Sequence, residues 1–311
     1  MKPFSPKLDI ISENIIYLLS LDSRLTTTDL SKLLGVNRKI VECRVNKLYK
    51  QKFIKPLLVF NHKTIIKTTI LIKLTKFDRK ILSALAELKK FVKVKETLGL
   101  YDFSLLVITQ NEQQLQEILS KVNELFHDVI QNIDLVHHDI EDTLGYKSFC
   151  HELKFLQKYN LLKYDRDYQL TEEDLTLLEI LKYNPLISYN EIISKTIWNY
   201  RKIKDSIQNL KDKGVIRFSV DPDYTRLGLE FHNLLLKVNL AEKEAFEKNV
   251  MAHPRIHWIK IGIGTWDYIL SVAARDITEF IEIVRDIRTQ NKDYILNVSS
   301  LISNIHVMRR V

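Results

Sequence analysis

The stretch Asp29-Leu30-Ser31-Lys32-Leu33-Leu34-Gly35-Val36-Asn37-Arg38 predicts two short helices separated by a tight turn. Apolar residues at helical spacing favour a helix over residues 27–34, a glycine permits the turn, and Asn37 is a good N-cap for the next helix. An earlier helix is expected over residues 8–20, and an extended ribbon begins at Phe53. Three short helices followed by a ribbon indicate a winged helix-turn-helix domain.

The chain repeats this pattern when it is shifted by 162 residues. Apolar residues then fall on apolar residues, at Ile15/Leu177, Leu19/Leu181, Leu30/Ile192, Val41/Ile203, Leu48/Leu210 and Ile54/Ile216. Farther on, a shift of 165 places Gly99, Tyr101 and Asp102 on Gly264, Trp266 and Asp267. We therefore interpret the chain as a tandem duplication of one two-part unit, with a net insertion of three residues between the matched blocks.

The second copy departs from the first at its turn. Helices are expected over residues 171–182 and 188–196, Thr171 and Asp174 give an N-cap signal, and Asn199 opens the third helix. However, Ile197-Trp198 stands where the first copy has Gly35-Val36.

The second part of each copy is expected to run strand, helix, strand, strand, helix, strand. This order is typical of a ferredoxin-like sheet with helices on one face, and we expect the other face to pack on the sheet of the other copy. The predicted elements are 68–75, 78–91, 92–98, 102–109, 112–126 and 129–136, and then 232–240, 242–252, 256–261, 267–273, 276–288 and 294–302.

The predicted fold class is α+β, with two winged helix-turn-helix domains alternating with two ferredoxin-like domains. An amphipathic helical bridge, with Phe149, Leu153, Leu156 and Tyr159 on its apolar face, is expected between the copies. The predicted boundaries are 1–61, 62–137, 138–169, 170–226 and 227–311.

Net charge distinguishes the two copies. The 311 residues include 47 Lys and Arg against 39 Asp and Glu, a net charge of +8. Residues 1–79 alone hold 16 basic and 6 acidic residues, so the whole excess lies in the first copy. A clustered basic excess is the electrostatic footprint of a polyanionic partner. We therefore expect the first copy to supply most of any affinity for nucleic acid.

The polar face of each third helix supplies candidate contacts to double-stranded DNA. Arginine and asparagine can form bidentate hydrogen bonds with base edges, and lysine mainly neutralises phosphate. The candidates are Asn37, Arg38, Lys39, Glu42, Arg44, Asn46, Lys47 and Lys50 in the first copy, and Tyr200, Arg201, Lys204 and Gln208 in the second. The alternative for each face is a solvated or protein-binding surface.

These motifs resemble the Lrp/AsnC family of feast/famine transcriptional regulators. The resemblance rests on residues 29–38, on Arg44-Val45-Asn46-Lys47-Leu48, and on the turns Leu98–Asp102 and Ile263–Asp267. It implies a DNA-binding first domain and a second domain that dimerises and binds an amino acid or other small effector. The effector residues that it implies are Gly99, Tyr101, Asp102, Gly264, Trp266 and Asp267, and the alternative is a tight turn without a ligand.

Fusion of two copies implies a pseudo-dimer within one chain, and further association of chains stays open. An Lrp-like siroheme decarboxylase and a DNA-independent sensor are the rival functions. The decarboxylase would need His and Arg side chains in one pocket; His232 fits, but no histidine-rich stretch lies near Thr68.

Composition and motifs exclude several other classes. A content of 45% hydrophobic and 28% charged residues is typical of a soluble globular protein, so no membrane association is expected and the cytoplasm is predicted. Two cysteines cannot form a disulfide framework, and the histidine pairs 137/138 and 253/257 are interpreted as surface residues rather than metal ligands. No nucleotide or hydrolase motif is present, so no catalytic residue, metal or cofactor is predicted.

Overall fold

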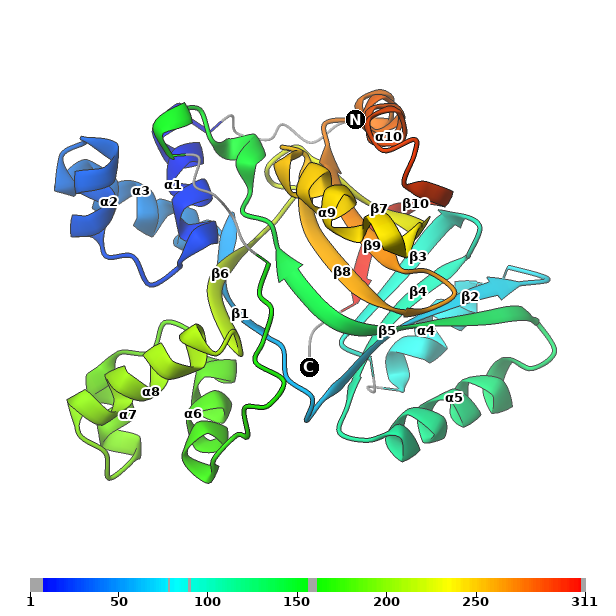
Figure 1. Ribbon diagram of the computed structural model, residues 1–311, viewed down its shortest axis with the longest axis horizontal. Helices are drawn as coiled ribbons and strands as arrows, with labels where there is room; N and C mark the ends of the chain where they lie inside the picture. Colours follow the sequence, from blue (N-terminus) through cyan, green and yellow to red (C-terminus); the bar gives the residue numbers. More distant parts are fainter. Residues whose placement is uncertain (1–7, 78, 89–90, 156–160, 309–311) are drawn as a thin grey trace. The chain divides into compact units, whose positions relative to one another are not determined.

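The computed structural model describes residues 8–308 except 78, 89, 90 and 156–160. Its mixture of helices and strands confirms the predicted α+β class. The chain divides into two compact units, one of Met1–His62 with Asp142–Gly228 and one of Lys63–Glu141 with Leu229–Val311. Each unit therefore combines corresponding parts of the two halves of the sequence (Figure 1).

In the first unit, three helices and a strand occur twice. Thr26 and Thr171 each form a capping box, with Asp29 and Asp174 respectively. The predicted caps Asn37 and Asn199 are confirmed, since their side chains accept hydrogen bonds from backbone N–H groups at the starts of α3 and α8. The elements are α1 (Ile10–Leu21), α2 (Thr27–Leu34), α3 (Arg38–Lys50) and β1 (Ile54–Phe60), then α6 (Glu172–Tyr183), α7 (Tyr189–Lys195), α8 (Tyr200–Asp212) and β6 (Ile216–Pro222).

Strands β1 and β6 join the two halves of this unit. They pair antiparallel with Leu57 opposite Ser219, while Ile54 faces Pro222 and Phe60 faces Ile216. Ser219 is the residue that the shift of 162 places on Leu57, so each strand meets its own counterpart about this central pair.

The bridge between the halves is not the predicted amphipathic helix. Strand β5 (Ile130–Thr143) extends into it, and two 3-10 turns follow, η1 (Lys147–Phe149) and η2 (Leu153–Phe155). Gly145 has φ +65°, which interrupts a continuous helix, and the buried Tyr146 hydroxyl donates to the Val220 carbonyl at 2.6 Å. Phe149 is buried as expected, whereas Leu156 and Tyr159 lie outside the described residues.

The second unit is an eight-stranded closed barrel, in the order β10-β3-β4-β2-β5-β8-β9-β7. The four strands from each half are thus joined edge to edge in one barrel, rather than only packed face to face as expected. Its elements are β2 (Ile66–Leu74), α4 (Arg79–Glu87), β3 (Lys93–Gly99), β4 (Phe103–Thr109), α5 (Glu112–Phe126) and β5, then β7 (Glu230–Val238), η3 (Leu240–Glu242), α9 (Lys243–Ala252), β8 (Ile256–Gly264), β9 (Tyr268–Ala274), α10 (Ile277–Gln290) and β10 (Ile295–Met308).

Alternating strand residues face two different cores. One cluster lies between the first-half strands and helices α4 and α5, and includes Ile70, Phe103 and Val122. A second cluster combines residues of both halves and includes Leu71, Leu235 and Trp266. The helices therefore cover the outer face of the barrel, and the second cluster fills its interior (Figure 1).

Candidate nucleic-acid interface

Helix α3 turns an apolar stripe to the core of its half and a polar face to solvent. Val41 and Leu48 are buried, as their helical spacing requires. Of the first-copy residues predicted to contact DNA, all but Arg44 are exposed, namely Asn37, Arg38, Lys39, Glu42, Asn46, Lys47 and Lys50.

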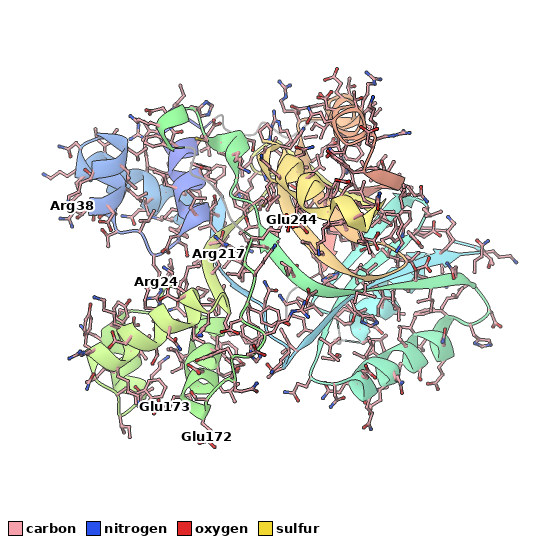
Figure 2. The ribbon with its side chains drawn as sticks, viewed as in Figure 1. Arg24, Arg38, Glu172, Glu173, Arg217 and Glu244 are labelled. Atoms are coloured by element: carbon pink, nitrogen blue, oxygen red, sulfur yellow. The ribbon has the colours of Figure 1, made fainter. Side chains whose placement is uncertain are left out.

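The cations on this face are not neutralised by the protein. Within the described part of the chain, no ion pair involves Arg38 (Figure 2), Lys39, Lys47 or Lys50. Arg44 differs, because its Nη2 lies 2.8 Å from Oδ2 of Asp9, the N-cap of α1. Four basic side chains are thus available to phosphate or base edges, and the fifth is held against α1.

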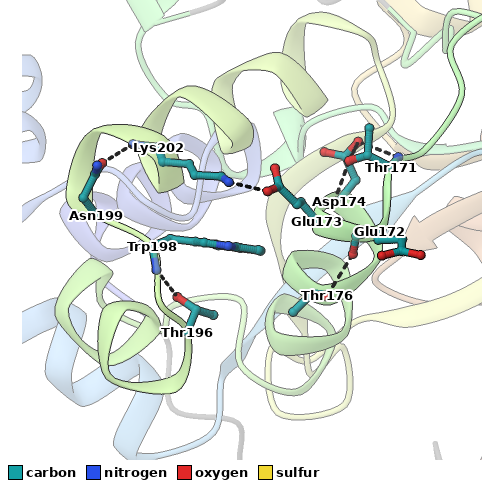
Figure 3. Close-up of polar contacts among 9 residues, drawn as sticks. All are labelled: Thr171, Glu172, Glu173, Asp174, Thr176, Thr196, Trp198, Asn199 and Lys202. Atoms are coloured by element: carbon teal, nitrogen blue, oxygen red, sulfur yellow. Dashed lines mark hydrogen bonds and ion pairs between the residues drawn. The ribbon is translucent and has the colours of Figure 1, made fainter.

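Helix α8 carries a comparable exposed face whose charges are largely neutralised. Arg201 lies 3.7 Å from Asp205, and the Gln208 amide donates to Asp212 at 2.7 Å. The Lys202 ammonium pairs with Glu173 of α6 (Figure 3). The predicted residues Tyr200, Arg201, Lys204 and Gln208 are all exposed, but the face as a whole attracts anions less than the face of α3 does.

The turn that precedes α8 is built differently from the turn that precedes α3. Gly35 ends α2 in the left-handed region at φ +65°, whereas Thr196 ends α7 with extended backbone. The Thr196 hydroxyl donates to the Ile192 carbonyl at 2.9 Å and accepts a hydrogen bond from the Trp198 N–H (Figure 3). Trp198 packs on the core of the second half. Ile197, between these two anchored residues, is completely exposed, at 102%.

Arg24 connects the two helix sets of the first unit. Its guanidinium donates to the Pro185 carbonyl at 3.1 Å and to the Ile187 carbonyl at 3.0 Å (Figure 2). It also lies 4.6 Å from the ring centre of Phe218. Lys211 adds a link to Asp22 at 2.9 Å. These contacts join the turn after α1 to the turn after α6, to β6 and to α8 within one compact unit.

In the barrel unit, the two predicted effector-turn glycines occupy equivalent, crowded positions. Gly99 has φ +134° and Gly264 has φ +147°. A Cβ on Gly99 would lie 2.4 Å from the Ser300 oxygen, and a Cβ on Gly264 would lie 2.0 Å from the Leu135 oxygen. Glycine is required at both turns because another backbone passes there.

The other predicted effector residues separate into two groups. Tyr101 and Trp266 meet in the barrel: the Trp266 indole donates to the Tyr101 hydroxyl at 3.1 Å, and that hydroxyl donates to Asp134 at 2.5 Å. Burial and the hydrogen bond to Asp134 raise the pKa of Tyr101 to about 12. Asp102 and Asp267 lie apart from this group, because they accept hydrogen bonds from the backbone N–H groups of strands β2 and β7.

Sequence reasoning missed a buried basic cluster in the barrel. Glu141 lies 3.2 Å from the Lys67 ammonium and 3.7 Å from the Lys260 ammonium. His138 hydrogen-bonds to Thr69 at 2.9 Å, and burial together with the Lys260 charge holds its pKa well below the usual value. The cluster was missed because strand β5 was expected to end at residue 136.

The predicted surface position of the histidine pairs is wrong for two residues. His138 is half-buried in the cluster around Glu141, with its Nδ1 atom enclosed, and His257 of β8 is fully buried. Among the described residues, no group of His, Cys, Asp and Glu is arranged to hold a metal ion, and no helix is long and apolar enough to cross a bilayer.

Comparison with known proteins gives two kinds of similarity, and no protein-family model matches the chain. An uncharacterised HTH-type transcriptional regulator of Pyrococcus furiosus is 26% identical over 122 residues, which are 38% of this chain and 82% of that protein. The siroheme decarboxylase NirDL aligns over 97% of this chain and 93% of its own, with a TM-score of 0.59 and 13% identity. E. coli AsnC aligns over 42% of this chain and 92% of its own, with a TM-score of 0.34 and 22% identity.

Over 122 residues, the chain is similar in sequence to a protein named as a helix-turn-helix transcriptional regulator. The match to NirDL shows that nearly the whole chain shares a fold with an enzyme. The chain is therefore similar to transcriptional regulators in sequence and to a siroheme decarboxylase in fold.

Proposed function

We propose that this protein is a sequence-specific DNA-binding transcriptional regulator of the Lrp/AsnC type that acts in the cytoplasm. Its first unit would hold two winged helix-turn-helix domains, and its second unit two ferredoxin-like domains fused in one barrel. Two copies of one ancestral unit would thereby form a pseudo-dimer within a single chain.

The internal symmetry of both units supports a duplication. Leu57 faces its own counterpart Ser219 where the two helix sets join. In the barrel, Gly99 lies against Ser300, and Gly264 lies against Leu135. At a shift of 165, Gly264 is the counterpart of Gly99, and Ser300 is the counterpart of Leu135. Such self-complementary contacts are those of a two-fold interface, and one chain here supplies both sides.

The observation that carries the DNA-binding function is the exposed cationic face of α3. Four basic residues lie on its 13 residues without an ion pair in the described structure. Arg38 and Lys39 are at its N-terminal end, the part of a recognition helix that contacts base edges. Each lysine that meets a phosphate releases counterions, so affinity falls with rising salt.

The test is duplex binding as a function of salt. We expect Lys47→Gln with Lys50→Gln to lower the slope of log affinity against log salt by about two. The matched control is Lys121→Gln with Lys248→Gln, two exposed lysines of the barrel unit, which should leave the slope unchanged. Arg38→Ala should cost about 1–3 kcal/mol and relax base preference if Arg38 contacts a base. Binding that is absent at low salt, or indifferent to salt, would refute the proposal.

We also propose that a small effector, such as an amino acid, binds beside the Tyr101–Trp266 pair. Support comes from the polar Asp134 side chain, to which both Tyr101 and the Thr265 hydroxyl donate. Calorimetric titration with individual amino acids should detect binding in the intact chain and loss of that binding in Tyr101→Phe. Equal binding by both proteins would place the effector elsewhere.

A specific observation favours siroheme decarboxylation as a second candidate. Strand pairing makes Thr68 the counterpart of His232, and Thr68 hydrogen-bonds to His137 at 3.0 Å. A histidine therefore lies near this position in both halves, although only one was expected. Lys67 and Lys260 lie on the opposite, inner face of the sheet, where both pair with Glu141, and there they could bind the acidic side chains of a tetrapyrrole.

Incubation of the intact chain with siroheme, followed by mass spectrometry, tests this candidate. Loss of carbon dioxide that is abolished by Lys260→Met and retained by Lys248→Met, at an exposed lysine, would establish an enzyme and replace the regulator proposal. Unchanged siroheme, together with salt-dependent DNA binding, would eliminate the decarboxylase.

A further inference from the structure

The two helix sets of the first unit present chemically different surfaces at equivalent positions. Arg38 opens α3 and is charged, whereas its counterpart Tyr200 opens α8 and is 52% exposed. Gly35 in the first turn has no side chain, whereas its counterpart Ile197 is completely exposed. The second copy therefore offers apolar and aromatic groups where the first offers a cation.

The exposure of Ile197 is imposed by its neighbours. The Thr196 hydroxyl is bonded to the Ile192 carbonyl, and Trp198 packs on the core of the second half while the Lys202 ammonium lies 5.4 Å from its ring centre (Figure 3). Residues 196 and 198 are thus both anchored to the second half, and Ile197 between them is left in solvent at the bend that precedes α8. The fold holds a branched apolar side chain in solvent where it adds nothing to the core.

Two cations near the start of α8 already have carboxylate partners within the protein. Lys202 is held by Glu173, and Arg201 lies beside Asp205. Lys204 stays exposed without an ion pair in the described structure, so this face carries fewer unpaired cations than the face of α3 does. Ile197 and Tyr200 add an apolar and an aromatic group to it. In the major groove, the apolar group that distinguishes one base from the others is the 5-methyl group of thymine.

We infer that Ile197 contacts a thymine methyl group, so that the operator is asymmetric. One half-site is bound through the cations of α3, and a thymine-dependent half-site is bound through the second copy. This inference rests on the proposed DNA-binding function and adds a base preference to it. A symmetric regulator with two identical helices would select a palindrome; this chain selects two unlike half-sites.

The experiment uses the intact chain and a duplex selected from a random-sequence library at low salt. Each thymine is replaced in turn by deoxyuridine, which pairs identically but lacks the methyl group, and the dissociation constant is measured by fluorescence anisotropy. We expect one or two thymines of one half-site to lose about fourfold in affinity, the effect of one buried methyl group. With Ile197→Ala, these replacements should have no effect.

Leu175→Ala is the matched control, because Leu175 is an exposed apolar residue on α6 of the same half, at 51%. It should retain the full deoxyuridine effect. Both variants remove side chains from solvent, so each should keep the unfolding midpoint of the parent protein.

Retention of the deoxyuridine effect by Ile197→Ala, or absence of any methyl-dependent thymine, would overturn the inference. In the second case, salt-dependent binding to the selected duplex would leave the proposed function standing. A chain that binds no duplex at low salt would overturn both.

Discussion

The turn glycines of the barrel give a quantitative prediction about stability, with Gly264→Ala as the perturbation. The new Cβ would lie 2.0 Å from the Leu135 oxygen, well over 1 Å inside the ordinary contact limit of 3.4 Å. That same oxygen accepts a hydrogen bond from the Thr265 N–H at 3.3 Å. Strands β5 and β8 must therefore move apart where the two halves of the barrel join.

The expected loss of unfolding free energy follows from two contributions. A residue other than glycine at φ +147° costs about 1–3 kcal/mol. Weakening one or two backbone hydrogen bonds adds about 1 kcal/mol each. Together these give about 2–5 kcal/mol for Gly264→Ala, and a comparable loss for Gly99→Ala, whose Cβ would lie 2.4 Å from the Ser300 oxygen.

Gly35→Ala is the internal control. Gly35 also has a positive φ, +65°, but a Cβ there would meet nothing within 4 Å. Its replacement should cost only the left-handed backbone penalty, about 1–2 kcal/mol. Urea unfolding followed by circular dichroism measures the three losses, and hydrogen exchange of β5 and β8 localises them. A loss below about 1 kcal/mol for Gly264→Ala, or equal losses at positions 264 and 35, would refute the steric argument.

Three further predictions concern charged groups. Arg24→Ala should lower the unfolding free energy by about 3 kcal/mol, because two charge-assisted hydrogen bonds are lost, and Arg24→Lys should recover little of it in urea titrations. Burial lowers the pKa of His138 and His232 in the folded barrel. The unfolding free energy is therefore highest above pH 6.5 and falls at lower pH, where the unfolded chain binds protons that the folded chain does not. Hydrogen exchange of the barrel strands at pH 7.5 and 5.5 should show more frequent opening at the lower pH. Asp212→Lys, which gives α8 the residue found at Lys50 of α3, should steepen the salt dependence of duplex binding by about one.

Local elements of this fold can be predicted from the sequence, because their signals lie within a few residues. The caps at Asn37, Thr171 and Asn199 and the apolar stripes of α3 and α8 are such signals, and the structure contains all of them. The bridge was predicted wrongly because the spacing of Phe149 and Leu153 fits a helix, whereas Gly145 and the buried Tyr146 direct the chain into 3-10 turns.

The candidate sites depend on contacts between distant residues, which periodicity does not indicate. Tyr101 was predicted beside Asp102, yet its hydroxyl binds Asp134, and the Asp102 carboxylate binds the end of a strand. The cluster around Glu141 combines residues of β2, β5 and β8, so it exists only once the barrel closes. The sequence could indicate which residue types were available, but not which of them would meet.

The charge asymmetry between the copies has a structural origin that the net count alone does not reveal. The carboxylates that neutralise the second face are Glu173, Asp205 and Asp212. At a shift of 162, these positions correspond to Ile11, Cys43 and Lys50 of the first copy, none of which is acidic. These three carboxylates lower the attraction of α8 for phosphate. The exposed side chain of Ile197 belongs to the same half of the chain. In the proposed regulator, both features would make the second face contribute base preference more than affinity, while the cations of α3 would supply the electrostatic attraction.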